Sequence, residues 1–227
     1  MDIGTILLEL LQGFGNTILL FAVTLVLSIP LGLIVALGSM SKFKPLKYLV
    51  KGFIWVIRGT PLLLQALLVS FIPKYVFGLG NKNFAGFLGI SINGLMFVFV
   101  AIAFVINYAC YFSEIFRGGI ESIQKGQHEA GLVLGMTKKQ IFFKVVLLQV
   151  FKKVLPPVSN EVITLVKDTA LAQILGVIDL LNAAEHAVNE YGVLTPFVYA
   201  AIFYLLFNGL LTLLFGYLER KMAFYKE

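Results

Sequence analysis

The chain has 227 residues, of which 59% are hydrophobic and only 13% are charged, and its mean hydropathy is +0.92. A soluble domain of this size is about half apolar and about a quarter charged, so the composition excludes an ordinary soluble enzyme and indicates an all-α integral membrane protein. We expect residues 1–227 to form one transmembrane domain. A single cysteine and two histidines far apart in the sequence provide neither an intramolecular disulfide nor a metal-ligand spacing.

The hydrophobic stretches predict five transmembrane helices, because a helix needs roughly 20 mainly apolar residues to cross about 30 Å of hydrocarbon. The expected spans cover approximately residues 14–39, 50–72, 88–116, 151–175 and 193–218. Pro30 and Gly32 predict a kink in the first span, which membrane helices tolerate. The sequence "RGTP", Arg58 to Pro61, interrupts the second span.

Lysine and arginine collect in the segments after the first and third spans and in the C-terminal tail. Cytoplasmic loops of membrane proteins carry this excess, so we expect the N-terminus outside and the C-terminus in the cytoplasm. The net charge of +6 is thereby explained without nucleic-acid binding. The N-terminal stretch has no basic region before its apolar residues, so we expect it to stay in the mature protein.

A polar, basic segment, Lys125 to Phe142, lies in the loop 118–150 between spans three and four. It predicts a short helix from Glu129, a break near Gly135, and a second helix begun by Thr137 and Gln140, which have capping-box spacing. Such a helix suits docking into a groove of another protein. It equally suits resting on lipid headgroups, and the spacing alone leaves both open.

Several blocks resemble a known family. The loop is similar to the Glu-Ala-Ala loop of binding-protein-dependent ABC importer permeases: Glu129, Ala130 and Gly135 match, Gly131 replaces the second alanine, and Leu148 stands where proline is usual. Three further blocks are similar to signature blocks of the polar amino-acid permeases, relatives of the histidine, arginine, glutamine and cystine systems. They are "VIRGTPLLLQ" (56–65), "YFSEIFRGGIESIQKGQHEAG" (111–131) and "LPPVSNEVITLVKDTALAQILGVIDLL" (155–181).

The resemblance implies a subunit of an ATP-driven importer in the bacterial plasma (inner) membrane, working by alternating access. Its implied partners are a second permease copy or a sister permease, two cytoplasmic ATPase subunits and an extracytoplasmic amino-acid-binding protein. The chain contains no G-x-x-x-x-G-K-[ST] sequence, so we expect no ATPase activity in it and place ATP and Mg on the ATPase subunits.

On this resemblance the loop is a coupling helix that fits a cleft of the ATPase. Glu129 would supply a charged contact at the helix start, and Ala130, Gly131 and Gly135 would allow close backbone approach. The acidic segment 177–192 is expected either to dock the binding protein or to serve as a solvated connector.

Charged groups inside spans are costly and are candidates for function. Glu161 and Asp168 are seven residues apart, so they share a helix face about 10 Å apart along the axis. Facing a cavity, they would suit an amino acid with two cationic groups, such as arginine, lysine or ornithine. Alternatively, Asp168 pairs with Lys167 or another helix and Glu161 makes a structural hydrogen bond. Cationic amino acids are the leading substrates, with glutamine, histidine or cystine as alternatives.

Other polar groups in the spans are candidates for lining the same pathway or for joining helices by hydrogen bonds. They are Thr60, Gln65, Asn107 and Tyr111. Arg58 is expected to snorkel or to pair near the cytoplasmic end, and Glu114 with Arg117 to form a local i,i+3 pair. A membrane enzyme lacks support because no set of catalytic residues is recognisable. A stand-alone secondary transporter usually has paired repeats, which this sequence does not show.

Overall fold

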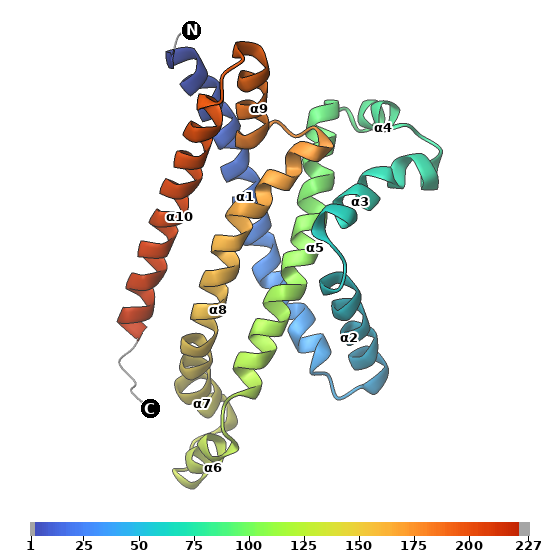
Figure 1. Cartoon of the computed structure of the whole chain (residues 1–227). Coiled ribbons are helices and arrows are strands. Elements are labelled where there is room, and N and C mark those ends of the chain that lie inside the picture. Colours follow the sequence, from blue (N-terminus) through green and yellow to red (C-terminus); the bar gives the residue numbers. More distant parts are fainter. Residues whose placement is uncertain (1–2, 223–227) are drawn as a thin grey trace.

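The computed structural model describes residues 3–222, and the regular structure in this range is entirely helical (Figure 1). The long helices are α1 (Ile3–Ser39), α5 (Ile92–Glu121), α8 (Leu147–Asp168) and α10 (Thr195–Met222). Shorter elements connect them: α2 (Lys44–Arg58), α3 (Leu62–Phe77), α4 (Asn81–Leu88), α6 (Lys125–Val133), α7 (Lys138–Ile141), a π-helix η1 (Phe142–Val146), a 3₁₀-helix η2 (Thr169–Leu175) and α9 (Leu180–Tyr191).

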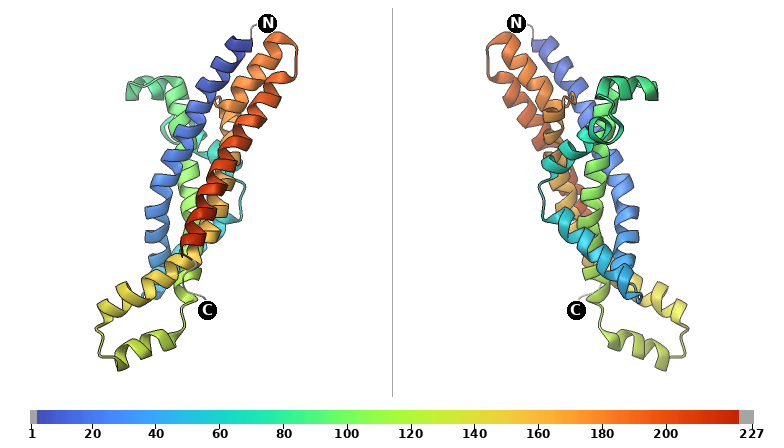
Figure 2. Two further views of the ribbon diagram at one scale, coloured as in Figure 1. Left: turned by 90° about the vertical axis from the view of Figure 1, so that its left-hand side faces the viewer. Right: turned by 90° about the vertical axis from the view of Figure 1, so that its right-hand side faces the viewer.

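The two ends of the molecule differ in charge. The first residues of α1 lie at one end with α4 and α9, and α6 and α7 lie at the other (Figures 1 and 2). The end with α6 and α7 also holds the basic turn between α1 and α2, where Lys42, Lys44 and Lys47 lie. The opposite end carries Glu185 and Glu190 on α9. This distribution is the physical basis for the orientation inferred below.

Helices α1 and α5 pack closely at the centre of the bundle. At Gly32 an added Cβ would lie 2.9 Å from both the Ala109 carbonyl oxygen and the Phe112 Cβ, so only glycine fits this contact. The assigned α-helix continues without a break through Pro30. It also begins at Ile3, well before the expected span, because Ile6 and Leu10 are buried against α9.

The main hydrophobic core joins α1, α5, α8 and α10. Its fully buried members include Leu20, Phe104, Phe112 and Leu165, and in a membrane such side chains stabilise the bundle through van der Waals packing between helices. The outer surface of α10 is mostly exposed and apolar, as expected of a helix that faces lipid.

The region expected as one second span is two helices, α2 and α3, that meet at an angle of 105° across the short break at Gly59–Pro61. Proline lacks an amide donor and restricts the residue before it, so helices end in front of it. The sequence placed this break correctly. The direction of α3, which turns away from α2 towards α4 (Figures 1 and 2), was not predicted.

Within residues 3–222, three helices are long and apolar enough to cross a membrane, namely α1, α5 and α10, and the bent pair α2–α3 qualifies only when it is counted together. Helix α8, the expected fourth span, does not pass this test of length and composition. It carries two lysines near its start and Glu161, Lys167 and Asp168 towards its end.

The loop between α5 and α8 has the expected helix–break–helix form. Thr137 accepts a hydrogen bond from the Gln140 backbone amide, and the Gln140 side chain accepts one from the Thr137 amide, so the capping box is confirmed. Gly135 has a φ of 74°, a conformation that favours glycine. The first helix, α6, begins at Lys125 rather than at Glu129.

Candidate functional site

A cavity of about 450 Å³ opens where the break between α2 and α3 faces α5 and α8. It is lined by five of the six residues predicted for the substrate pathway: Thr60 from the break, and Asn107, Tyr111, Glu161 and Asp168 from the spans. Three separate parts of the chain therefore supply the lining. We call it the pathway cavity.

Two carboxylates of α8 dominate the chemistry of the pathway cavity. Glu161 and Asp168 both line it, as their spacing on one helix face predicted. The Tyr108 hydroxyl donates a 2.7 Å hydrogen bond to Asp168 Oδ2, so the partner of Asp168 comes from α5. Within residues 3–222, Glu161 makes no hydrogen bond or ion pair with another residue. Lys167 is exposed.

Gln65 lies beside the cavity without lining it. Its side-chain amide donates to the Ile57 carbonyl at 2.7 Å, to the Thr60 carbonyl at 3.1 Å and to the Thr60 hydroxyl at 2.8 Å. Its oxygen accepts a 3.0 Å bond from the Asn107 amide on α5. Gln65 thus fastens the break between α2 and α3 to α5. Its contacts favour the interhelical alternative for this residue, whereas Thr60 and Asn107 both bond to it and line the cavity.

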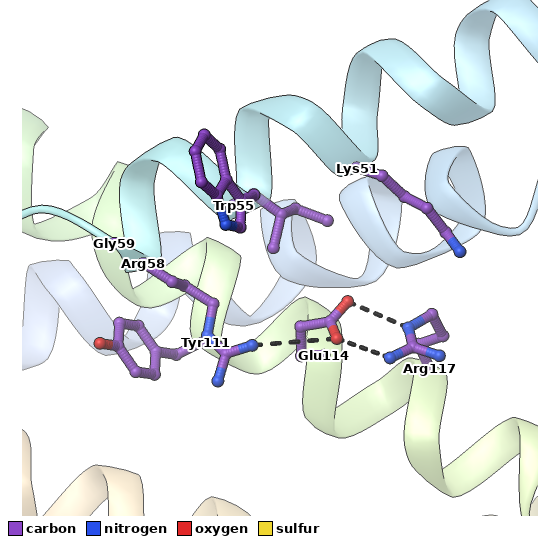
Figure 3. A pocket seen from close by; sticks show the side chains of 8 residues that line it. Lys51, Trp55, Arg58, Gly59, Tyr111, Glu114 and Arg117 are labelled. Carbon is purple, nitrogen blue, oxygen red and sulfur yellow. Dashed lines mark hydrogen bonds and ion pairs between the residues drawn. The ribbon is translucent and has the colours of Figure 1, made fainter.

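Arg58 forms the boundary between the pathway cavity and a second cavity of about 420 Å³, whose lining residues are drawn in Figure 3. The second cavity lies towards the basic end, because Lys51 of α2 and Arg117 near the end of α5 line it. The two cavities share Arg58, Gly59 and Tyr111, and the second is also lined by Lys51, Trp55, Glu114 and Arg117. The Arg58 guanidinium carbon lies 4.9 Å from the centre of the Tyr111 ring, a distance typical of cation–π attraction.

Glu114 and Arg117 form the local pair that their spacing predicted. Arg117 donates to both Glu114 oxygens, at 3.0 and 2.6 Å, and also to Glu121 at 2.6 Å. Arg58 approaches Glu114 only to 3.8 Å. Because Arg117 already occupies both oxygens of Glu114 (Figure 3), the contact with Arg58 is the weaker of the two.

The four residues assigned to coupling separate into two groups. Glu129 and Ala130 are exposed on α6. Gly131 is buried, and a Cβ on it would lie 2.7 Å from the Ile141 side chain, so glycine there serves the packing of α6 on α7. Gly135 serves the turn described above. The exposed surface of α6 continues into Leu132, Val133 and Leu134, which are 55%, 86% and 78% exposed.

Tyr108 and Thr164 line the pathway cavity but were missed by the sequence reasoning. A signal for each exists in the sequence. Tyr108 lies one helical turn before Tyr111. Thr164 lies three residues after Glu161 and four before Asp168, so Tyr108 and Thr164 each share a helix face with predicted residues. Within residues 3–222, no group of three or more histidine, cysteine or acidic side chains is arranged to hold a metal ion.

Curated relatives are similar over nearly the whole chain. The L-cystine transport system permease protein TcyB of Bacillus subtilis (strain 168) is 37% identical, with 94% of this chain and 86% of the relative covered. The arginine transport system permease protein ArtQ of the same organism is 33% identical, with 94% and 92% covered. A probable glutamine ABC transporter permease protein, GlnM, also of Bacillus subtilis (strain 168), is 31% identical over 93% of this chain and 92% of its own length.

Solved structures share the fold. A chain from a crystal structure of an amino acid ABC transporter with histidines superposes with a TM-score of 0.81 at 29% identity, covering 97% of this chain and 99% of its own. A chain of the MetNI methionine ABC transporter in an inward-facing conformation gives 0.70 at 16% identity, over 98% and 99%, and supports the fold alone. The family model of binding-protein-dependent transport system inner membrane components matches residues 28–224, so the chain belongs to this family of ABC transporter permeases.

Proposed function

We propose that the chain is the membrane-spanning subunit of an ATP-driven importer that moves cationic amino acids into the cell. The observation that carries the substrate class is the pathway cavity, where Glu161 and Asp168 are two helical turns apart on one face of α8. Two carboxylates at this separation complement a ligand with an α-amino group and a cationic side chain. They would repel an acidic amino acid.

The proposed topology has five spans: α1, the bent pair α2–α3, α5, α8 continued by η2, and α10. Helix α8 contains 22 residues, about 33 Å at 1.5 Å per residue, which is enough to cross the hydrocarbon. Its charges are tolerated in a membrane only where they face protein or a water-filled cavity. The basic end with α6 faces the cytoplasm by the positive-inside rule, which puts the N-terminus outside.

A second permease, either another copy or a sister chain, is proposed to close the pathway cavity. Thr164 and Lys167 on α8 are exposed although they lie on a helix proposed to cross the membrane. An ammonium group facing lipid hydrocarbon is strongly unfavourable. Packing of a second permease against this face would enclose a water-filled pathway between the two subunits and remove the cost.

Coupling to ATP hydrolysis is assigned to α6. Glu129, Ala130 and the apolar residues 132–134 form an exposed surface on the cytoplasmic end, and an exposed short helix with apolar side chains at its end fits a groove on a partner. The partner is the ATPase subunit, which carries ATP and Mg. Only residues 134–137 separate α6 from α7, and α7, η1 and α8 then follow one another without a break. A movement of α6 is therefore transmitted directly to α8.

The substrate class is tested by reconstituting the permease with its ATPase and binding protein in nanodiscs and measuring ATPase stimulation by each common amino acid. We expect stimulation by arginine, lysine or ornithine, and we expect Glu161→Gln to lower it more for these than for neutral amino acids. Glu219→Gln, the same change on α10 outside the cavity, is the control. Stimulation by glutamine or cystine alone would retain the importer and reject the cationic substrates.

Coupling is tested separately with Glu129→Arg, which inverts the charge on the exposed surface of α6. We expect normal insertion in the membrane but loss of most substrate-stimulated ATP hydrolysis and weaker co-purification of the ATPase. Glu219→Arg controls for the charge change. Unchanged uptake by Glu129→Arg would remove α6 as the coupling element, leaving the lipid-surface alternative.

A further inference from the structure

The guanidinium of Arg58 has hydrogen-bonding capacity that its own chain does not use. Five N–H donors are available on an arginine side chain. In the part of the chain that the structure describes, its contacts are the 3.8 Å approach to Glu114 and the stacking on Tyr111, and no hydrogen bond leads from it to another residue. Its side chain is 41% exposed, and this exposed surface lines both cavities.

The contact with Glu114 does not satisfy Arg58. Arg117 binds both oxygens of Glu114 at 3.0 and 2.6 Å, and a distance of 3.8 Å is too long for a hydrogen bond. The face of the Tyr111 ring attracts the guanidinium, whose carbon lies 4.9 Å from the ring centre. No hydrogen bond joins these two side chains in the part of the chain that the structure describes. Arg58 is therefore held in position by its neighbours while N–H donors of its guanidinium remain unused. The other charged groups that line the pathway cavity are the carboxylates of Glu161 and Asp168.

The charges along the pathway cavity have a definite order. Arg58 lines both cavities, whereas Glu161 and Asp168 line only the pathway cavity. Helix α8 begins at the basic end, so Glu161 comes before Asp168 on it (Figure 1). From the boundary with the second cavity onwards, the charged groups are therefore Arg58 of α2, then Glu161 and Asp168 of α8, which is positive, negative, negative. The chemical groups of a basic amino acid follow the complementary order: an α-carboxylate, an adjacent α-amino group, and a cation at the end of the side chain.

We propose that Arg58 binds the α-carboxylate of the transported amino acid, with the α-amino group at Glu161 and the side-chain cation at Asp168. A guanidinium and a carboxylate form paired, charge-assisted hydrogen bonds. Arg58 then makes the cavity selective for amino acids over amines that carry the same cationic side chain. This assignment rests on the amino-acid import proposed above.

The position of Arg58 also gives the carboxylate site a route to the cytoplasm. Arg58 lies where the two cavities meet, and the second cavity adds Lys51 and Arg117 on the side of the basic end. Glu114 also lines that cavity, but Arg117 donates to both of its oxygens. A carboxylate that leaves Arg58 in that direction therefore meets Lys51 as a further cation. A carboxylate bound near Asp168 instead would not lie next to the second cavity, because Asp168 lines only the pathway cavity.

The test is equilibrium binding of radiolabelled arginine to the permease–ATPase complex in nanodiscs, without the binding protein, so that only the permease selects. Two competitors each lack one group: agmatine has no carboxylate, and argininic acid has a hydroxyl in place of the α-amino group. For the wild-type protein we expect agmatine to bind roughly 10- to 100-fold more weakly than arginine, the range expected for charge-assisted hydrogen bonds.

The decisive variant is Arg58→Gln. We expect its affinity for arginine to fall to the level of agmatine, while its affinity for agmatine stays unchanged, which also shows that the variant is folded. Lys51→Gln, which removes a cation from the second cavity only, should keep the wild-type preference for arginine over agmatine. Glu161→Gln should instead abolish the difference between arginine and argininic acid.

Two results would overturn the role of Arg58: an unchanged affinity of Arg58→Gln for arginine, or an equal loss for arginine and agmatine. A different result would reject the proposal that the substrates are cationic. If a neutral amino acid binds and arginine does not, the affinities of the wild-type protein and of Arg58→Gln are compared for that amino acid and for its decarboxylated amine. This comparison still decides whether Arg58 binds the carboxylate. If the complex binds no amino acid at all, both assignments fall.

Discussion

Glu114 and Glu161 are both carboxylates inside the helical bundle, but their surroundings differ. Glu114 receives two hydrogen bonds from Arg117 and faces Arg58 at 3.8 Å. In the part of the chain that the structure describes, Glu161 has no such partner and lines a cavity. A charge removed from water without a partner is unfavourable, so we expect Glu114 to stabilise the scaffold, and the proposed role of Glu161 is to bind the cationic ligand.

Arg117 and Arg58 differ in the same way as Glu114 and Glu161. Arg117 is fully engaged with Glu114 and Glu121 on its own helix. Arg58 comes from α2, and it reaches the cavity only because the chain breaks directly after it. The paired side chains Glu114, Arg117 and Glu121 all belong to α5, whereas Arg58 and Glu161, which can form further hydrogen bonds, come from α2 and α8. A site assembled from separate elements can change its geometry when those elements move, as the proposed alternating access would require.

The largest expected effect in this comparison is on stability. Glu114→Gln leaves Arg58 without an anion and Arg117 with Glu121 alone, and we expect it to lower the free energy of unfolding by about 2 kcal/mol, measured as denaturation in detergent. Glu121→Gln, which removes the half-exposed partner of Arg117, should cost under about 1 kcal/mol. Glu161→Gln should leave stability equal or slightly higher. If it destabilised the protein as much as Glu114→Gln, the distinction between the two carboxylates would be wrong.

A smaller effect is expected at the hydrogen bond that orients Asp168. Tyr108→Phe removes the hydroxyl that donates to Asp168 Oδ2, and we expect arginine to bind about 5-fold more weakly, equivalent to roughly 1 kcal/mol. Tyr111→Phe is the matched control, because it keeps the ring that stacks on Arg58 while its hydroxyl makes no hydrogen bond within residues 3–222. Equal binding by both variants would show that Asp168 needs no positioning by Tyr108.

Much of the fold could be predicted from local sequence. The capping box at Thr137, the pair of Glu114 with Arg117, and the break at Arg58–Pro61 each depend on residues within a few positions of one another. The shared face of Glu161 and Asp168 follows from helix geometry in the same way. These predictions succeeded because the physics that decides them, hydrogen bonding to the local backbone and helical periodicity, acts over one or two turns.

Other features could not be predicted in this way. Helix α4 and the 105° bend after α2 depend on contacts with α5 that no local pattern contains. Gly131 stands where the family pattern has its second alanine and was expected to allow close approach to an ATPase, yet its glycine character is required by Ile141 of the same chain. Gln65 looked like a pathway residue, and its three bonds across the α2–α3 break arise only after the two helices are bent.

The amino-acid sequence by itself determined that this protein is helical and belongs in a membrane, because hydropathy and the distribution of lysine and arginine are additive along the chain. It also determined which residues carry charge into the spans. Only the tertiary structure decided which of these charges is satisfied. Glu114 is engaged and Glu161 is not because a partner within hydrogen-bonding distance depends on how α2, α5 and α8 pack, and packing is a property of the assembled bundle.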